Sequence, residues 1–335
     1  MLLGGAEGRI GDGSARTVVT RASSGETPLA GDRFDHDVVL TVTGSNRRSA
    51  DLLVGSPGAD AGRSADAGMV HLISDLLDVE GTPQLQALPL TQDAVGGRSE
   101  AGDQFGHALS LSGPDPQGRS TLLVGAPGED VGTAAGAGSV SVHHRQGGEL
   151  EGIAELRQGR GLPGTAQTGD RLGQTLAAGL VGAPGDTVSG RRGAGSVTLF
   201  HAEGTAVVPG RSFNQATPGV PGADEAGDQF GSALAFGHHA RTLLVGIPGE
   251  DVGRVRDAGA VQPVTLGSSR TLRSPPSITE NAPGTAGSVG TDIRFGEAFG
   301  SLPGSREHLL TIASPYAVRG SVYVLSDGVR VPARS

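Results

Sequence analysis

The chain has 335 residues, with 58 glycines, 20 prolines, no cysteine and 3% aromatic residues, and its formal net charge is −9. The lack of cysteine excludes a disulfide framework, and the negative net charge argues against nucleic acid as a partner. The 26 basic residues are all arginines and lie scattered along the chain, so they form no basic patch. No apolar run is long enough for a transmembrane helix, and Met1 is not followed by a signal-peptide core, so no membrane insertion is expected.

Three signals recur five times in the same order. They are an Asp-x-Phe-Gly-like turn, a Leu-Leu-Val-Gly-Ala-Pro-Gly-like run and a Gly-Ser-Val-like segment. The proline of the second signal stands at positions 57, 127, 184, 248 and 315. A unit of this length exceeds a helical hairpin repeat of about 34–47 residues and suits four short strands with their loops. The sequence therefore predicts an array of one all-β unit.

Each unit is expected to contain four strands in a fixed order. The first follows the Asp turn, as at 107–111 and 232–236, and is mostly small and apolar. The second is a short apolar run closed by Gly-x-Pro-Gly, and the third alternates apolar and polar residues, as strands do. Second strands are expected at 52–54, 122–124 and 243–245, third strands at 140–142 and 197–199, and fourth strands at 85–88, 153–156, 205–208 and 270–272.

One domain spans residues 1–335, and its fold class is predicted to be an all-β propeller of four-stranded antiparallel blades. The repeats are expected at about 31–90, 91–160, 161–215, 216–280 and 281–325. Residues 17–20 are expected to form a fourth strand, whereas the last unit ends after its third strand at 322–325. Residues 1–30 would thus complete the last blade and close a five-bladed ring, which removes exposed sheet edges. The alternative is that the chain is part of a seven-bladed ring.

Two sets of acidic residues are candidate sites. Acidic loop residues follow the second strands and would gather on one face of the propeller. There they would bind a cation or a basic partner, or simply cap their own turns. These residues are Asp60, Glu129, Asp130, Asp186, Glu250 and Asp251. A structural role is favoured for the Asp of each first signal, whose carboxylate can accept backbone N–H bonds in the turn. This second set is Asp32, Asp103, Asp170, Asp228 and Asp292.

No metal site or catalytic residue is predicted. The pairs His143–His144 and His238–His239 lie on expected strands or loops, where adjacent side chains point to opposite faces. No nucleophile-elbow or phosphate-binding motif is present.

The Phe-Gly and Gly-Ala-Pro signals resemble the FG-GAP repeat of integrin alpha-subunit propellers, and more closely its secreted, actinobacterial-type relatives. Segments 225–231 and 124–132 carry the resemblance most clearly, and it extends over residues 31–325. It implies a β-propeller, usually of seven blades, that acts in adhesion or ligand binding outside the cell or at its surface.

Three departures from that family are evident. There are five units rather than seven, and the fifth has lost Gly-Ala-Pro-Gly. The family's calcium loops join the first and second strands, but here the segments 43–51, 112–121 and 236–242 keep no set of three carboxylates, and the third loop is nearly deleted. No cofactor is therefore expected, although calcium remains possible.

The leading functional hypothesis is a monomeric, non-enzymatic interaction module that binds a protein or glycan through its loop faces. The first alternative is a hydrolase or lyase with its site at the central channel. The second is a truncated paralogue without an independent role.

Overall fold

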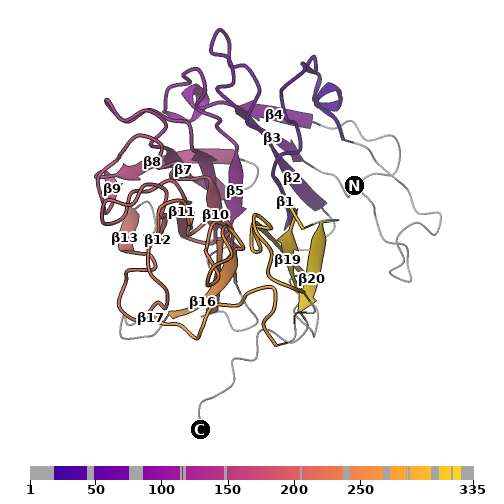
Figure 1. Cartoon of the computed structure of the whole chain (residues 1–335). Helices are drawn as coiled ribbons and strands as arrows, with labels where there is room; N and C mark the ends of the chain where they lie inside the picture. Colours follow the sequence, from indigo (N-terminus) through magenta and orange to yellow (C-terminus); the bar gives the residue numbers. More distant parts are fainter. Residues whose placement is uncertain are drawn as a thin grey trace, which may run out of the picture.

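The computed structural model describes residues 19–43, 49–74, 86–113, 115, 118–146, 149–203, 206–236, 242–266, 272–283, 285, 287–302, 309–317 and 320–325. Five separate sheets are arranged as the blades of a β-propeller (Figure 1), which confirms the predicted fold class. The described helical segments are two short 3₁₀ helices, Arg21–Ser24 and Asp93–Val95. No helix in the described part of the chain has the length and apolar character needed to cross a membrane.

The strands of each blade follow one another in chain order. Blade 1 contains β1 (Val38–Thr43), β2 (Ser49–Ser56), β3 (Met69–Ser74) and β4 (Gln86–Leu90). Blade 2 contains β5 (Ala108–Leu111), β6 (Ser120–Ala126), β7 (Ser139–Gln146), β8 (Glu149–Gln158) and the short parallel β9 (Gly161–Leu162). Blade 3 contains β10 (Thr175–Ala177), β11 (Leu180–Ala183), β12 (Ser196–Glu203) and β13 (Ala206–Phe213).

The last two blades are less complete. Blade 4 contains β14 (Leu234–Phe236), β15 (Thr242–Ile247), β16 (Ala260–Leu266) and β17 (Leu272–Arg273). Blade 5 has three strands among the described residues: β18 (Ala298–Leu302), β19 (Leu309–Ser314) and β20 (Ser321–Leu325).

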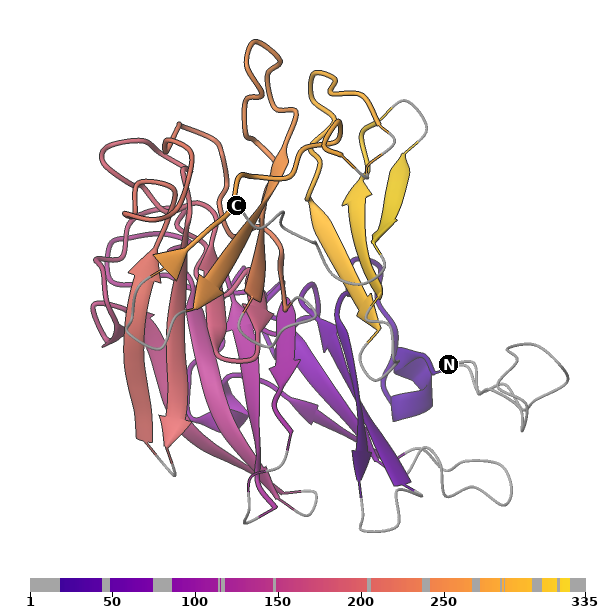
Figure 2. The same cartoon turned by 90° about the horizontal axis from the view of Figure 1, so that it is seen from below.

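Contacts join β1 to β5, β5 to β10, β10 to β14 and β14 to β18, so the first strand of each blade is the innermost. Figure 2 shows the blades side by side, with their loops gathered at the two ends of the strands.

The N-terminal segment packs on blade 1. Of the strand expected at 17–20, Thr17 and Val18 lie outside the described residues, while Val19 and Thr20 are not in a strand. Val19 packs against the cluster of Leu52, Val54 and Ile73. Any strand that residues 1–18 add to the last blade therefore also lies outside the described residues.

The hydrophobic core lies between the blades. In β6, Leu122 and Val124 pack in a cluster with blade 1, whereas Leu123 packs in a cluster with blade 3. Further clusters join blades 3 and 4 and blades 4 and 5. Because the middle strands are buried on both faces, their sequences are continuous apolar runs and do not alternate between apolar and polar residues.

A contact between two glycines holds neighbouring blades at close range. The glycine that precedes Ala-Pro-Gly lies against the glycine of the next unit's turn: a Cβ added to Gly125 would lie 2.0 Å from the carbonyl oxygen of Gly173. The same contact joins Gly55 to Gly106, Gly182 to Gly231 and Gly246 to Gly296. Only glycine allows this approach, because any Cβ would overlap the neighbouring backbone.

Blades 5 and 1 lack this pair. Ala313 pairs with Val322 just as Gly246 pairs with Val261, so it occupies the first glycine position. Asp35, with φ 80°, follows Phe34 where Gly106 follows Phe105. Val38 and Leu40 on β1 and Val322 and Val324 on β20 are also exposed. The described residues at the ends of the blade array thus do not repeat the glycine contact of the other four interfaces.

Replacing Gly246 with alanine should destabilise the fold by about 1–3 kcal/mol or more, since the new methyl group would overlap the Gly296 carbonyl. Gly113→Ala is the matched control, because a Cβ there meets nothing within 4 Å. Urea unfolding of both variants measures the difference. Equal stability of the two would show that the blades do not depend on this close approach.

Candidate functional site

The Asp of the first signal is a buried structural residue in four units. Asp32, Asp103, Asp170 and Asp228 are at most 5% exposed. Each accepts a hydrogen bond at Oδ2 from the backbone N–H three residues earlier, at 2.5–2.6 Å. The turn hydrogen bond expected from the sequence is therefore present in these units.

The expectation for Asp292 is wrong. The Arg294 amide donates to the Asp257 carbonyl just as the Gln104 amide donates to Asp66, so Arg294 corresponds to Gln104. Ile293, 8% exposed, therefore takes the place of the carboxylate. Asp292, with φ 59°, corresponds to Gly102, with φ 88°. The extra residue in Asp-Ile-Arg-Phe-Gly shifts the aspartate out of register.

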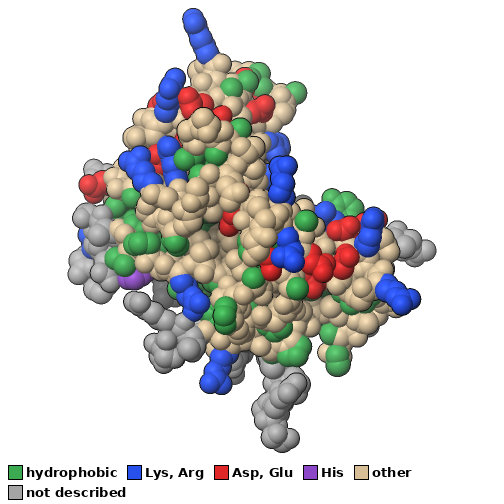
Figure 3. Space-filling model, turned by 60° about the vertical axis from the view of Figure 1, so that its left-hand side comes forward, with side chains coloured by type: hydrophobic (Ala, Val, Ile, Leu, Met, Phe, Trp, Pro, Cys, Tyr) green, Lys and Arg blue, Asp and Glu red, His purple; other side chains and the backbone are tan. Residues whose placement is uncertain are grey.

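The acidic loop residues divide into two positions with different roles. The second of these positions holds Asp60, Asp130 and Asp251, which are exposed. Each accepts a bond from the backbone N–H six residues later, at 2.8–3.1 Å, and so caps its own loop. On the face shown in Figure 3, acidic side chains lie in small groups with arginines near them.

The first position holds Glu129, Asp186 and Glu250, which are less exposed and engage the surrounding protein. Glu129, 4% exposed, accepts from Gln92 Nε2 at 2.9 Å and pairs with Arg157 Nη2 at 3.1 Å. Glu250 accepts from Gln215 Nε2 at 2.6 Å, and Asp186 accepts from Ser196 Oγ at 2.6 Å. In blade 1 this position is Ala59.

The glutamines at these junctions were not predicted from the sequence. Gln92, Gln158 and Gln215 are at most 7% exposed; Gln92 and Gln215 follow β4 and β13, and Gln158 is the last residue of β8. Each precedes the turn Asp of the next unit by a nearly constant interval, and that interval is the signal from which they could have been found. Each glutamine lies in a repeated set with the turn Asp and the first acidic loop residue of the next unit. We call this set of three residues the junction site.

Burial raises the pKa of the junction carboxyls. The pKa of Asp103 is raised to about 6 and that of Glu129 to about 7, in each case mainly by burial. Burial likewise raises the pKa of Asp170 to about 6 and that of Asp228 to about 7, and the negative charges of Asp186 and Glu250 respectively add to the effect.

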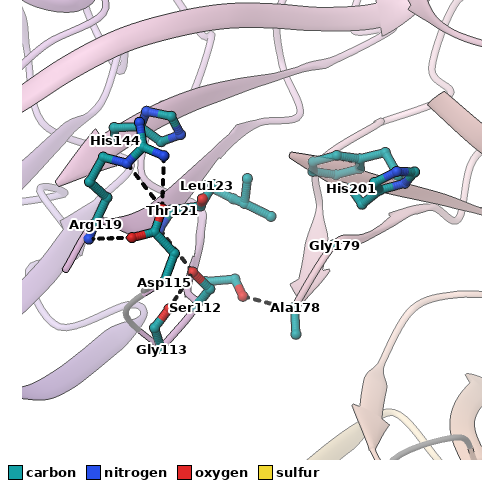
Figure 4. A pocket seen from close by; sticks show the side chains of 12 residues that line it. Ser112, Gly113, Asp115, Arg119, Thr121, Leu123, His144, Ala178, Gly179 and His201 are labelled. Atoms are coloured by element: carbon teal, nitrogen blue, oxygen red, sulfur yellow. Dashed lines mark hydrogen bonds and ion pairs between the residues drawn. The ribbon is translucent and has the colours of Figure 1, made fainter. Parts of the chain in front are cut away.

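A cleft opens between blades 2 and 3 at the opposite ends of the strands. Its volume is about 260 Å³. Arg119, Asp115 and Ser112 lie on one side and His201 and Gly179 on the other (Figure 4). The cleft is open because the hairpin of β10 and β11 is cut down to the turn at Ala178 and Gly179. The nearly deleted third loop noted in the sequence therefore creates this space.

An ion pair shapes one wall of the cleft. Asp115 accepts from the Arg119 backbone N–H at 2.9 Å and from Arg119 Nε at 3.0 Å. Ser112 Oγ accepts from the Thr121 N–H, and Ser110 Oγ accepts from the Ala178 N–H, each at 2.9 Å. The first bond lies within blade 2, and the second joins blade 2 to the hairpin of blade 3.

The two histidines of β7 point to opposite faces, as predicted. His144 lines the cleft. His143 pairs with Leu122 on the face toward blade 1, and burial lowers its pKa to about 4. His238 and His239 lie outside the described residues.

Within the described ranges, no group of three or more His, Cys, Asp or Glu could hold a metal ion. Much of the segments aligned with the family's calcium loops, including 44–48 and 237–241, lies outside those ranges.

Comparison with protein-family models and with curated proteins gives no match for this chain. The resemblance to FG-GAP repeats therefore rests on the motifs alone.

Glu129 should make the protein less stable as pH rises. Its pKa in the fold is about 7 against an ordinary value of 4.5, so the folded state binds the proton more tightly. The free energy of unfolding should therefore fall between about pH 4.5 and 7, by an amount on the order of 2 kcal/mol. Gln92, Asp103, Arg157 and Glu155 are the polar and charged groups that face it, with Gln92 and Arg157 opposing the shift.

Guanidinium unfolding of wild type and Glu129→Gln at pH 5 and pH 8 measures this effect. Wild type should lose more stability than the variant between the two values. Parallel losses would contradict the raised pKa.

Proposed function

We propose that the protein is a non-enzymatic extracellular or cell-surface module of the FG-GAP, integrin-like kind that binds a protein or glycan through its loop faces, as a monomer. The observation that carries this proposal is the cleft between blades 2 and 3. It is the place where a shortened hairpin exposes several hydrogen-bonding side chains next to an aromatic ring, Phe200.

The lining of the cleft favours a glycan. Arg119 and Asp115 are each about one-third exposed and held by their ion pair, so they are oriented before a ligand arrives. Ser112, Thr121 and His201 add donors and acceptors that match sugar hydroxyls. Polar groups fixed in advance lose less conformational entropy on binding.

The same lining does not favour hydrolysis. Glycoside hydrolases ordinarily use two carboxyl groups, one as acid and one as base or nucleophile. Among the described lining residues Asp115 is the single carboxylate, and it is paired with Arg119. We therefore prefer binding to catalysis in this cleft.

Arg119→Ala should weaken glycan binding about tenfold or more, because a hydrogen bond to a charged group contributes about 1.5–3 kcal/mol. A glycan array identifies the sugar, and titration calorimetry with that sugar compares the variants. Arg98→Ala, which removes an 82% exposed arginine from a connector, is the control and should bind like wild type. Equal losses in both variants, or no sugar bound at all, would contradict a glycan site in the cleft.

A further inference from the structure

The junction sites neutralise their buried carboxylates in different ways. In blade 1 an arginine stands at the glutamine position: Arg21 precedes Asp32 by the same interval as Gln92 precedes Asp103. Arg21 is 8% exposed, and its Nη1 lies 2.5 Å from Asp32 Oδ2. This junction therefore carries its own cation, and its first loop position is the uncharged Ala59.

Blades 2 and 5 also avoid an uncompensated pair. In blade 2, Arg157 reaches Glu129 at 3.1 Å. In blade 5, Ile293 replaces the carboxylate altogether. In blade 3, Asp186 is partly exposed and bonded to Ser196, whereas Asp170 is fully buried and pairs with no arginine among the described residues.

The junction between blades 3 and 4 likewise has no arginine paired with its carboxylates among the described residues, and more negative charges surround its turn Asp than surround Asp170. Asp228 is 1% exposed, and the Gly249 amide donates to its carbonyl at 3.1 Å, which places the adjacent Glu250 beside it. Neither carboxylate forms an ion pair with any arginine among the described residues, whereas the charges of Glu225 and Asp251 add to the negative potential. Asp228 is buried and Glu250 is half-buried, and holding two such carboxylates together is unfavourable unless a proton or a counter-charge neutralises them.

A third oxygen at this junction has no partner, as is also the case for Oε1 of Gln92 and Gln158 at the other junctions. Gln215 is 2% exposed, and its Oε1 is buried without a hydrogen bond, although its Nε2 donates to Glu250. A half-turn of the amide exchanges its oxygen and nitrogen, which brings Oε1 toward Glu250. Two carboxylates and an amide oxygen are ligands that hard cations prefer.

We propose that the junction between blades 3 and 4 binds a calcium ion through Asp228, Glu250 and the amide oxygen of Gln215. Calcium suits the site better than magnesium, because it accepts irregular sets of carboxylate and amide oxygens, whereas magnesium requires near-ideal octahedral geometry. The ion takes the place that the Arg21 guanidinium holds in blade 1 and ties the outer strand of blade 3 to the loop of blade 4. The site lies at the end of the strands opposite to the loops that join first and second strands.

Calcium should raise the melting temperature of chelator-treated wild-type protein by several degrees, because it binds the folded state. Titration calorimetry with CaCl₂ should detect binding, and magnesium should bind more weakly. Asp228→Asn should abolish both the binding and the shift. Asp60→Asn, which removes a carboxylate from the equivalent loop of blade 1, is the matched control and should keep both.

Gln215→Arg provides a second, independent variant. It copies the arrangement of blade 1, so in chelator it should melt above wild type and should no longer respond to calcium. No calcium response in wild type, or an undiminished response in Gln215→Arg, would overturn the proposal, even if Asp228→Asn failed to fold.

Discussion

The architecture depends on the backbone approach of one glycine to another between neighbouring blades. At four interfaces the glycine before Ala-Pro-Gly meets the carbonyl of the glycine in the next unit's turn, with no room for a Cβ. This contact sets how closely the inner ends of the blades pack. It also explains why two motifs that are far apart in each unit recur together, since each is half of an interface rather than a site in itself.

Close packing has an electrostatic consequence. The turn Asp and the acidic loop lie next to the glycines that touch, so bringing the blades together buries their carboxylates. The buried turn hydrogen bonds satisfy one oxygen of each Asp, and the remaining charge is met by Arg21 in blade 1 and by Arg157 in blade 2. In blades 3 and 4 no arginine is paired with these carboxylates among the described residues, and we propose that a bound cation balances the charge of Asp228 and Glu250.

Much of the fold could be predicted from the sequence because each signal has a local physical cause. Apolar runs closed by Gly-x-Pro-Gly indicated β2, β6 and β15, and the alternation in 140–142 indicated β7. The register of Asp292 was misread, because an inserted residue can be detected only from the backbone bonds that Arg294 makes. The acidic loops were treated as one rim because the sequence does not show that neighbouring residues, such as Glu250 and Asp251, face the interface and the solvent respectively.

The candidate sites were harder to predict because they are assembled across blades. The buried glutamines lie at the end of one blade and act on the loop of the next, and the cleft exists because a hairpin in blade 3 is shortened beside a loop of blade 2.

Anomalous diffraction from crystals grown with calcium tests the electrostatic account most directly. It predicts a peak bounded by Asp228, Glu250 and Gln215 and none beside Arg21 and Asp32. An empty junction between blades 3 and 4 at saturating calcium would contradict it.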